Sequence, residues 1–271
     1  MALTAFQRSV CRLLAERRIA SGESYVAGGG ALGEATSSRR VSRDIALFHD
    51  TADSVAASWD ADRRLLDLHG HTVRALRERR TFVEAVVTLG DDAVLVQWAA
   101  DSAYRFFPLV EHVDFGLTLA PFDLATNKVL ALVGRVEARD WVDVIASHGS
   151  IQALGYLAWA ACGKDPGFSP ASILAHAART ARYTEDEIAA LAFEGGAPSA
   201  GELSRTWHAM LDEARGLVAA LPPSRAGTCV LGADGTLFRG GLGELAAAIA
   251  ADEVRYRSGS VRGVLPSVRR A

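Results

Sequence analysis

Residues 25–48 read YVAGGGALGEATSSRRVSRDIALF, and this stretch decides the fold. A short β-like segment, Tyr25–Ala27, runs into three glycines, after which a short helix is expected over Ala31–Thr36. Glycine lets a backbone approach a ligand closely, and the N-terminus of a helix offers free N–H groups to anionic phosphates. Arg39 and Arg40 add positive charge. The stretch therefore predicts a cradle for phosphate groups between a strand and a helix.

A carboxylate follows this turn on the next predicted strand, Ser42–Phe48. Asp44 lies near the start of that strand. A phosphate cradle beside a carboxylate on a strand is the arrangement that metal-assisted phosphoryl or nucleotidyl transfer requires. The alternative interpretation is a glycine-rich turn beside a surface aspartate, because a run of glycines alone is a weak signal.

The rest of the chain places strands first and helices later. Alternating hydrophobic residues predict three strands, at 71–76, 82–89 and 93–98, and Gly90-Asp91-Asp92 forms a hairpin connection between the last two. Helical periodicity dominates from Pro121 onward, and a second, short hairpin is expected from residues 228–231 and 236–239. We therefore predict an α+β fold, with a first domain over residues 1–145 and a helical C-terminal domain over residues 146–271 that ends in a basic tail.

Net charge and cysteine spacing argue against a broadly basic nucleic-acid-binding protein and against a disulfide-linked or zinc-finger protein. The 271 residues carry a net charge of −3, so any nucleic-acid binding must come from a local patch, for which Arg74, Arg77, Arg79, Arg80 and the basic tail are candidates. Such runs of charge are also common on solvated faces. The three cysteines form no CxxC pair, which favours reduced thiols and a cytoplasmic location. No signal peptide and no membrane-spanning segment are expected.

A second cluster of chemically interesting residues lies between positions 123 and 143. Lys128 and Arg135 are seven residues apart and share a helix face, as do Asp140 and Asp143 at a spacing of three. Lysine occurs only twice in this arginine-using chain, which favours a function that needs an ammonium group. The alternative is a surface lysine whose stem covers apolar neighbours.

These motifs together resemble a known family. GGGAL is followed by RVSRDIALF at residues 40–48, by DLATNKVLALVGR at residues 123–135 and by RDWVD at residues 139–143. In order and spacing they are similar to the motifs of the AbiEii/AbiGii-type nucleotidyltransferase toxins of the DNA polymerase β superfamily, over residues 4–145.

The resemblance implies a minimal nucleotidyltransferase domain with a mixed β-sheet. It also implies Mg²⁺ or Mn²⁺ as cofactor, a nucleoside triphosphate such as ATP, GTP or CTP as donor, an RNA 3′ end (tRNA in several relatives) as acceptor, and a cognate antitoxin as partner. The site residues that it implies are Gly28 and Gly29 for the triphosphate, Arg40 and Ser42 to support that loop, Asp44 for the metal, Lys128 for the phosphates, and Asp140 and Asp143 in the last motif.

One position departs from the family pattern. The family reads Asp-Ile-Asp where this chain reads Asp44-Ile45-Ala46. Residues two apart on a strand share a face, so two carboxylates at that spacing can hold one or two cations, and Ala46 supplies no ligand. The chain is either an engineered inactive variant or a natural degenerate member. The third carboxylate is also open: Asp101 is the nearest acid, Gln97 is the other candidate position, and Asp101 could instead cap a loop.

Two functions follow. The first is a nucleotidyltransferase toxin that transfers NMP to an RNA 3′ end and is inactivated here by Ala46. The second is a catalytically dead member of the same fold that binds a nucleotide, an RNA or a partner protein. A helical scaffold without a metal would leave the glycine turn unexplained. The residue that the native gene encodes at position 46 distinguishes the first two functions.

Overall fold

A computed structural model describes residues 3–179 and 183–262, which fold as two compact units. Unit 1 contains residues 3–103, 108–120 and 262, and unit 2 contains residues 104–107 and 121–261. The main change of unit therefore falls between Ala120 and Pro121, whereas the sequence predicts a boundary at residue 145. The helices between these two positions belong to unit 2.

Unit 1 is built on a mixed sheet that has seven strands in the described part of the chain. The strand order is β3-β4-β5-β2-β1-β8-β7, with β2–β5 and β1–β8 parallel and the other neighbours antiparallel. The expected hairpin around Gly90 joins β4 to β5, and the predicted α+β class with a mixed sheet is confirmed. The strands are β1 (Ser24–Ala27), β2 (Asp44–His49), β3 (Thr72–Arg79), β4 (Phe82–Leu89), β5 (Asp92–Ala100), β7 (Val110–His112) and β8 (Gly116–Thr118).

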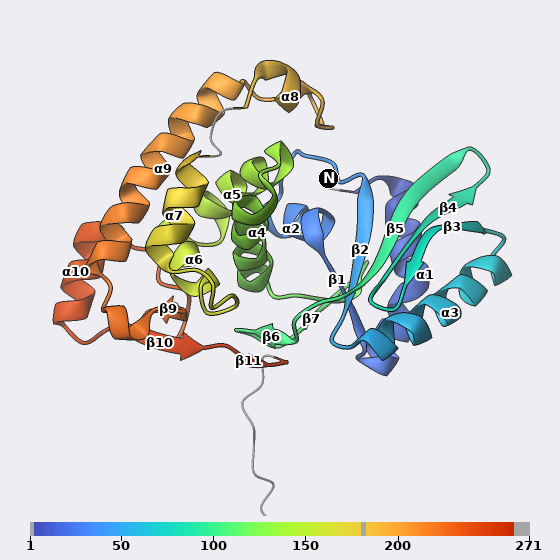
Figure 1. The fold of residues 1–271 in the computed structure, drawn as a ribbon, viewed down its shortest axis with the longest axis horizontal. Helices are drawn as coiled ribbons and strands as arrows, with labels where there is room; N and C mark the ends of the chain where they lie inside the picture. Colours follow the sequence, from blue (N-terminus) through green and yellow to red (C-terminus); the bar gives the residue numbers. More distant parts are fainter. Residues whose placement is uncertain (1–2, 180–182, 263–271) are drawn as a thin grey trace, which may run out of the picture. The chain divides into compact units, whose positions relative to one another are not determined.

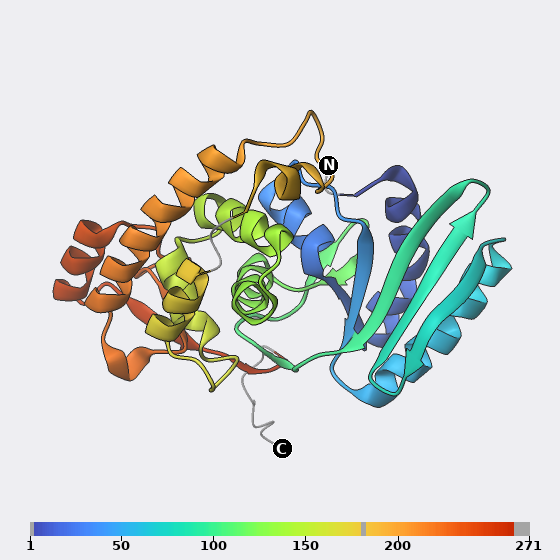
Figure 2. The same ribbon diagram turned by 45° about the horizontal axis from the view of Figure 1, so that its top comes forward.

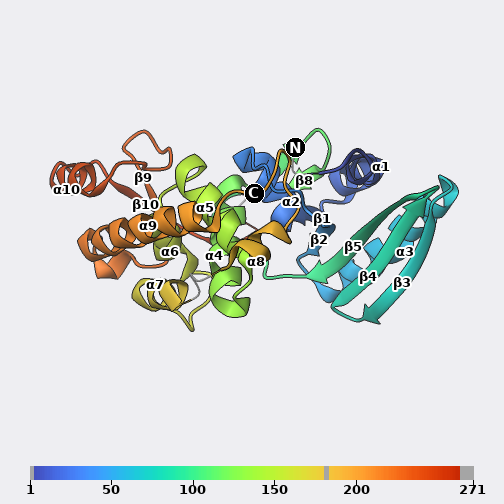
Figure 3. The ribbon, with the colours of Figure 1, turned by 90° about the horizontal axis from the view of Figure 1, so that it is seen from above.

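Helices α1 (Ala5–Ser21) and α3 (Ala52–Leu68) form the core of unit 1 with this sheet. Figure 3 shows α3 running along β3, β4 and β5. The Trp59 ring on α3 meets the Trp98 ring on β5 at 4.9 Å between centroids. A capping box between Thr4 and Gln7 fixes the start of α1, and the Thr51 hydroxyl caps α3.

Alternation along the strands assigns each side chain to one of two faces. Ile45 and Leu47 on β2 are buried on the face that carries Trp98, because Leu47 is the register partner of Trp98. Asp44 and Ala46 therefore lie on the opposite face, as strand geometry predicts for positions two apart. We call this second face the site face of the sheet.

Buried His49 on the core face of β2 predicts a pH dependence of stability. Burial, with a further contribution from the Arg18 charge, lowers the pKa of His49 from 6.5 to about 4. Between these values the unfolded chain binds a proton that the folded chain does not, so stability falls as the pH falls. We expect a loss of about 2 kcal/mol in unfolding free energy between pH 7 and pH 5.

Urea unfolding of unit 1 at a series of pH values measures this effect. His49→Gln should flatten the profile in that range, whereas His69→Gln, at an exposed position, should keep the slope of the parent protein. An unchanged slope in His49→Gln would show that another group causes the dependence.

Unit 2 is mainly helical and is organised around the buried helix α6, which contacts α4, α7 and α9. Figures 1 and 2 show α9 running along α6 and α7. This packing explains why α4 and α5 belong to unit 2. Its elements are β6 (Tyr104–Arg105), α4 (Pro121–Arg135), α5 (Ala138–Ser150), α6 (Leu154–Ala161), α7 (Pro170–Arg179), α8 (Glu185–Ala189), α9 (Ala200–Ala220), η1 (Pro223–Arg225), β9 (Thr228–Leu231), α10 (Leu242–Ala250), β10 (Arg255–Ser258) and β11 (Ser260–Val261).

The C-terminal part of unit 2 agrees in part with the sequence prediction. Residues 228–231 and 236–239 pair through the expected turn: Leu231 and Leu237 form an antiparallel bridge, and the N–H groups of Gly232 and Phe238 donate to the carbonyls of Thr236 and Val230. Strand β9 also pairs with β10, a pairing that the sequence did not predict. The part of the predicted basic tail at Arg255 and Arg257 is strand β10, and residues 263–271 lie outside the described residues. In the described ranges no helix is long and apolar enough to cross a membrane.

Candidate nucleotide site

The glycine turn joins β1 directly to a helix. Helix α2 (Gly28–Thr36) begins at Gly28, three residues earlier than the predicted start at Ala31. Its N-cap residue, Ala27, provides no side-chain acceptor for the first N–H groups of the helix. Gly28 itself has φ +73°, a left-handed conformation that favours glycine. The chain thus presents a helix N-terminus without a side-chain cap at the end of a strand.

Close packing explains why glycine occupies this turn. A Cβ added to Gly28 would lie 3.2 Å from the Cβ of Ala46, which places the start of α2 against the site face of the sheet. A Cβ added to Gly29 would overlap Nη2 of Arg40. The Arg40 side chain is buried, so its guanidinium lies beside the glycine backbone and brings positive charge to the helix N-terminus.

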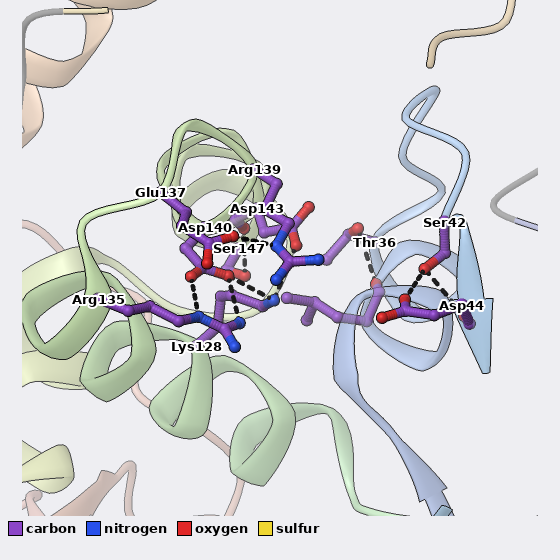
Figure 4. Close-up of polar contacts among 11 residues, drawn as sticks. Thr36, Ser42, Asp44, Lys128, Arg135, Glu137, Arg139, Asp140, Asp143 and Ser147 are labelled. Carbon is purple, nitrogen blue, oxygen red and sulfur yellow. Dashed lines mark hydrogen bonds and ion pairs between the residues drawn. The ribbon is translucent and has the colours of Figure 1, made fainter. Parts of the chain in front are cut away.

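Ser42 and Asp44 form the next part of the site. The Ser42 hydroxyl donates a hydrogen bond to Oδ1 of Asp44 at 3.0 Å, as Figure 4 shows, and it also lies 3.1 Å from the Asp44 carbonyl oxygen. The Ser42 carbonyl accepts a hydrogen bond of 2.8 Å from Nε2 of buried Gln7 on α1. The loop that precedes β2 is therefore anchored to α1. The structure brings Gly28, Gly29, Arg40, Ser42 and Asp44 into one region of unit 1.

Position 46 begins a row of register partners that continues on β5 and then on β4. Ala46 is the register partner of Gln97 on β5, and Gln97 is the partner of Glu84 on β4. Gln97 Nε2 donates a hydrogen bond of 2.9 Å to Oε1 of Glu84. All three lie on the site face with Asp44. Sequence reasoning missed Glu84, although the hairpin around Gly90 was a signal that could have identified it as the partner of Gln97.

The structure does not bring Asp101 to Asp44. Asp44 is in register with Leu95, and Asp101 follows the end of β5, where its N–H donates to the His49 carbonyl at 2.9 Å. Six residues of parallel strand separate Asp101 from the level of Asp44, which corresponds to roughly 20 Å. The expectation that Asp101 shares a metal ion with Asp44 is therefore corrected, and Gln97 occupies the position beside Ala46.

The residues on the site face do not match the two-metal arrangement that the resemblance implies. Mg²⁺ takes oxygen ligands in a near-octahedral arrangement, usually with one or two protein carboxylates. On β2 and β5 the available groups are one carboxylate, one methyl group and an amide that is already bonded to Glu84. Across residues 3–179 and 183–262, no three His, Cys, Asp or Glu side chains lie close enough together to hold a metal ion.

The later motif residues form a separate charge cluster in unit 2. Lys128 on α4 contacts Asp140 Oδ1 at 2.9 Å and Asp143 Oδ2 at 3.1 Å, both on α5 (Figure 4). Arg135 Nε contacts Asp140 Oδ2 at 2.6 Å. The predicted shared faces are thus confirmed. Lys128 is only 6% exposed, so the interpretation as a surface lysine is wrong. We call these four residues the α4–α5 charge cluster.

Burial and neighbouring charges oppose each other in this cluster. Burial raises the pKa of Asp140, whereas hydrogen bonds and charges from Arg135 and Lys128 lower it, with a net shift below 3.8. Two cations and two carboxylates balance in the cluster, as buried charges require. The second lysine behaves similarly: Lys164 contacts buried Asp123 at 2.8 Å, so the ammonium groups of both lysines are paired with aspartates.

Comparisons with known proteins support the fold alone. No protein-family model matches the chain, and no curated protein matches it. Among solved structures, JHP933 from Helicobacter pylori aligns at a TM-score of 0.51 and 12% identity, over 80% of this chain and 95% of that chain. MenT4, a nucleotidyltransferase toxin from Mycobacterium tuberculosis H37Rv, aligns at 0.46 and 12% identity, over 81% and 83%. The chain shares the fold of JHP933.

Proposed function

We propose that unit 1 binds the triphosphate of a nucleoside triphosphate at the glycine turn. The observation that carries this proposal is the position of the Arg40 guanidinium against Gly29, at the N-terminus of α2. The N–H groups at that end attract anions, and a buried guanidinium strengthens such contacts through charge-assisted hydrogen bonds. Ser42 orients Asp44 on the adjacent strand, where the carboxylate faces the same side as Ala46.

The reaction we assign to this framework is transfer of NMP to an RNA 3′ end, with tRNA as the expected acceptor. Its support is the order of the four sequence motifs that resemble the AbiEii/AbiGii-type toxins. In such enzymes Mg²⁺ or Mn²⁺ stabilises the charge on the transferring phosphate. Because Ala46 and Gln97 supply no carboxylates, we infer that this chain binds nucleotide but does not transfer it. A cytoplasmic location and an antitoxin partner belong to the same proposal.

The absence of carboxylates at Ala46 and Gln97 also supports a second function, that of a binding module. A site face with an alanine and an amide beside Asp44 can hold a nucleotide without reacting with it. In that case the chain would act by binding a nucleotide, an RNA or a partner protein. A carboxylate restored at position 46 separates the two functions, because transfer returns only in the first.

Nucleotide binding at the turn predicts the effect of Gly29→Val. A β-branched side chain there displaces the Arg40 guanidinium and blocks the approach of phosphates to the helix N-terminus. We expect the affinity for ATP, GTP, CTP and UTP to fall by at least about tenfold, since removal of one charge-assisted hydrogen bond costs about 1.5–3 kcal/mol. Isothermal titration with and without Mg²⁺ measures the change.

Gly134→Val is the matched control. It places the same side chain on an exposed helical glycine whose added Cβ meets nothing within 4 Å. Thermal melts of both variants show that the proteins compared are folded. Equal nucleotide affinity in Gly29→Val and Gly134→Val would remove the glycine turn from the site.

A further inference from the structure

Three arginines of β3 lie on one face of the sheet because of a bulge. Positions 74 and 77 are an odd number of residues apart, so in a regular strand their side chains would point to opposite faces. The register shifts between Ala75 and Arg77, which leaves Leu76 as the extra residue. Arg74 is therefore opposite Val86, Arg77 is opposite Glu84 and Arg79 is opposite Phe82.

This row of arginines lies on the site face. Glu84, the partner of Arg77, is itself the partner of Gln97, and Gln97 is the partner of Ala46. One line of register partners thus runs from position 46 on β2 across β5 and β4 to the edge strand β3. The opposite face of these strands carries Trp98 and is covered by α3, as Figure 3 shows. We call Arg74, Arg77 and Arg79 the β3 arginine row.

The row has the charge and the neighbours of a nucleic-acid surface. All three arginines are exposed, and Glu84, whose Oε1 accepts a hydrogen bond from Gln97, is the one carboxylate among their direct partners on β4. The partners of the three arginines are two residues apart, so the guanidiniums repeat at about 6.6–7 Å along the edge. Arg77 lies over the Phe82 ring, with Cζ 5.8 Å from the ring centroid. Arginines beside an aromatic ring match a strand of alternating phosphates and bases.

We propose that the β3 arginine row binds the phosphate backbone of a single-stranded RNA segment and leads its 3′ end along the sheet toward the position of Ala46. The inference rests on the proposed function, because it assigns the acceptor of that reaction to a surface of unit 1. The bulge at Leu76 is the structural device: it places three positive charges on the same face as Asp44 rather than on both faces.

Binding of a short, fluorescein-labelled single-stranded RNA of mixed sequence, followed by anisotropy over a range of salt concentrations, tests the proposal. Arg74→Ala/Arg77→Ala should weaken binding by roughly tenfold and reduce the slope of log affinity against log salt by about 1.4, or about 0.7 for each phosphate that is no longer neutralised. The matched control is Arg63→Ala/Arg64→Ala, which removes two exposed arginines of α3. This control should bind RNA as the parent protein does.

A charge exchange within the strand provides a second test. Arg77→Glu/Glu78→Arg keeps the composition and net charge but moves the positive charge to the other face, since Glu78 is the partner of buried Val83. We expect this variant to bind RNA more weakly than the parent protein. Equal binding by the exchange variant, or an equal loss in the α3 control, would overturn the proposal.

Titration of the same variants with nucleoside triphosphates separates this proposal from the proposed function. Nucleotide affinity that stays at the parent value while RNA affinity falls supports the arginine row independently. Loss of RNA affinity in the β3 variants of a protein that binds no nucleotide would refute the nucleotide site and leave the RNA surface in place. Nucleotide binding with no effect of any β3 substitution on RNA would refute the RNA surface alone.

Discussion

Replacement of Lys128 by alanine is expected to lower the unfolding free energy of unit 2 by about 3–5 kcal/mol. The Lys128 ammonium lies between Asp140 and Asp143, which are 0% and 2% exposed. Without it, both buried carboxylates lose the ammonium group that lies between them. The energetic cost is that of leaving a buried negative charge without its partner, rather than the net value of the ion pair.

Urea unfolding followed by tryptophan fluorescence measures the loss, because buried Trp141 lies in the same helix as both aspartates. The control is Lys128→Met/Asp140→Asn/Asp143→Asn, which removes the three buried charges together, leaves only half-exposed Arg135 and should recover much of the stability. Lys128→Ala with the stability of the parent protein would contradict a structural role. A fall in nucleotide affinity per folded molecule, without loss of stability, would instead assign Lys128 to the phosphates as the family resemblance implies.

The local features of the site could be predicted from the sequence because they depend on neighbouring residues. The glycine turn after β1, the shared face of Asp44 and Ala46, and the hairpin around Gly90 all follow from strand periodicity and turn chemistry. The pairing of Glu84 with Gln97 follows from the same hairpin, since Leu89 opposite Asp92 fixes every later pair.

Features that depend on distant pairing could not be predicted in this way. The choice between Asp101 and Gln97 depends on the register of parallel strands β2 and β5, which are separated by a helix and two other strands. Alternation alone also gives no sign of the bulge at Leu76, which decides the face of Arg77. Likewise, β9 pairs with β10 across the intervening α10, so this pairing also joins segments that are distant in the sequence.

Ala46→Asp is expected to convert this chain from one that does not transfer nucleotides into one that does. Positions 44 and 46 lie on the same face of β2, roughly 6.6–7 Å apart along the strand, so the new carboxylate joins Asp44 on the site face. Two carboxylates at this spacing provide oxygen ligands for a divalent cation, which one carboxylate beside an alanine does not. Because Gln97 is the register partner of position 46, Ala46→Asp/Gln97→Asp should show the largest activity.

Transfer of each of the four radiolabelled nucleotides onto total RNA, with Mg²⁺ or with EDTA, measures this gain. Ala46→Asn is the matched control: it has nearly the same shape without the charge, and it should stay inactive. Asp44→Asn should abolish the activity of Ala46→Asp, since both carboxylates are needed. If neither aspartate variant transfers any nucleotide while the parent chain binds nucleotide tightly, the binding-module function is correct. Transfer by the unaltered chain would instead show that its chemistry does not need a carboxylate at position 46. Comparison of that chain with Asp44→Asn alone would then show whether the Asp44 carboxylate is essential.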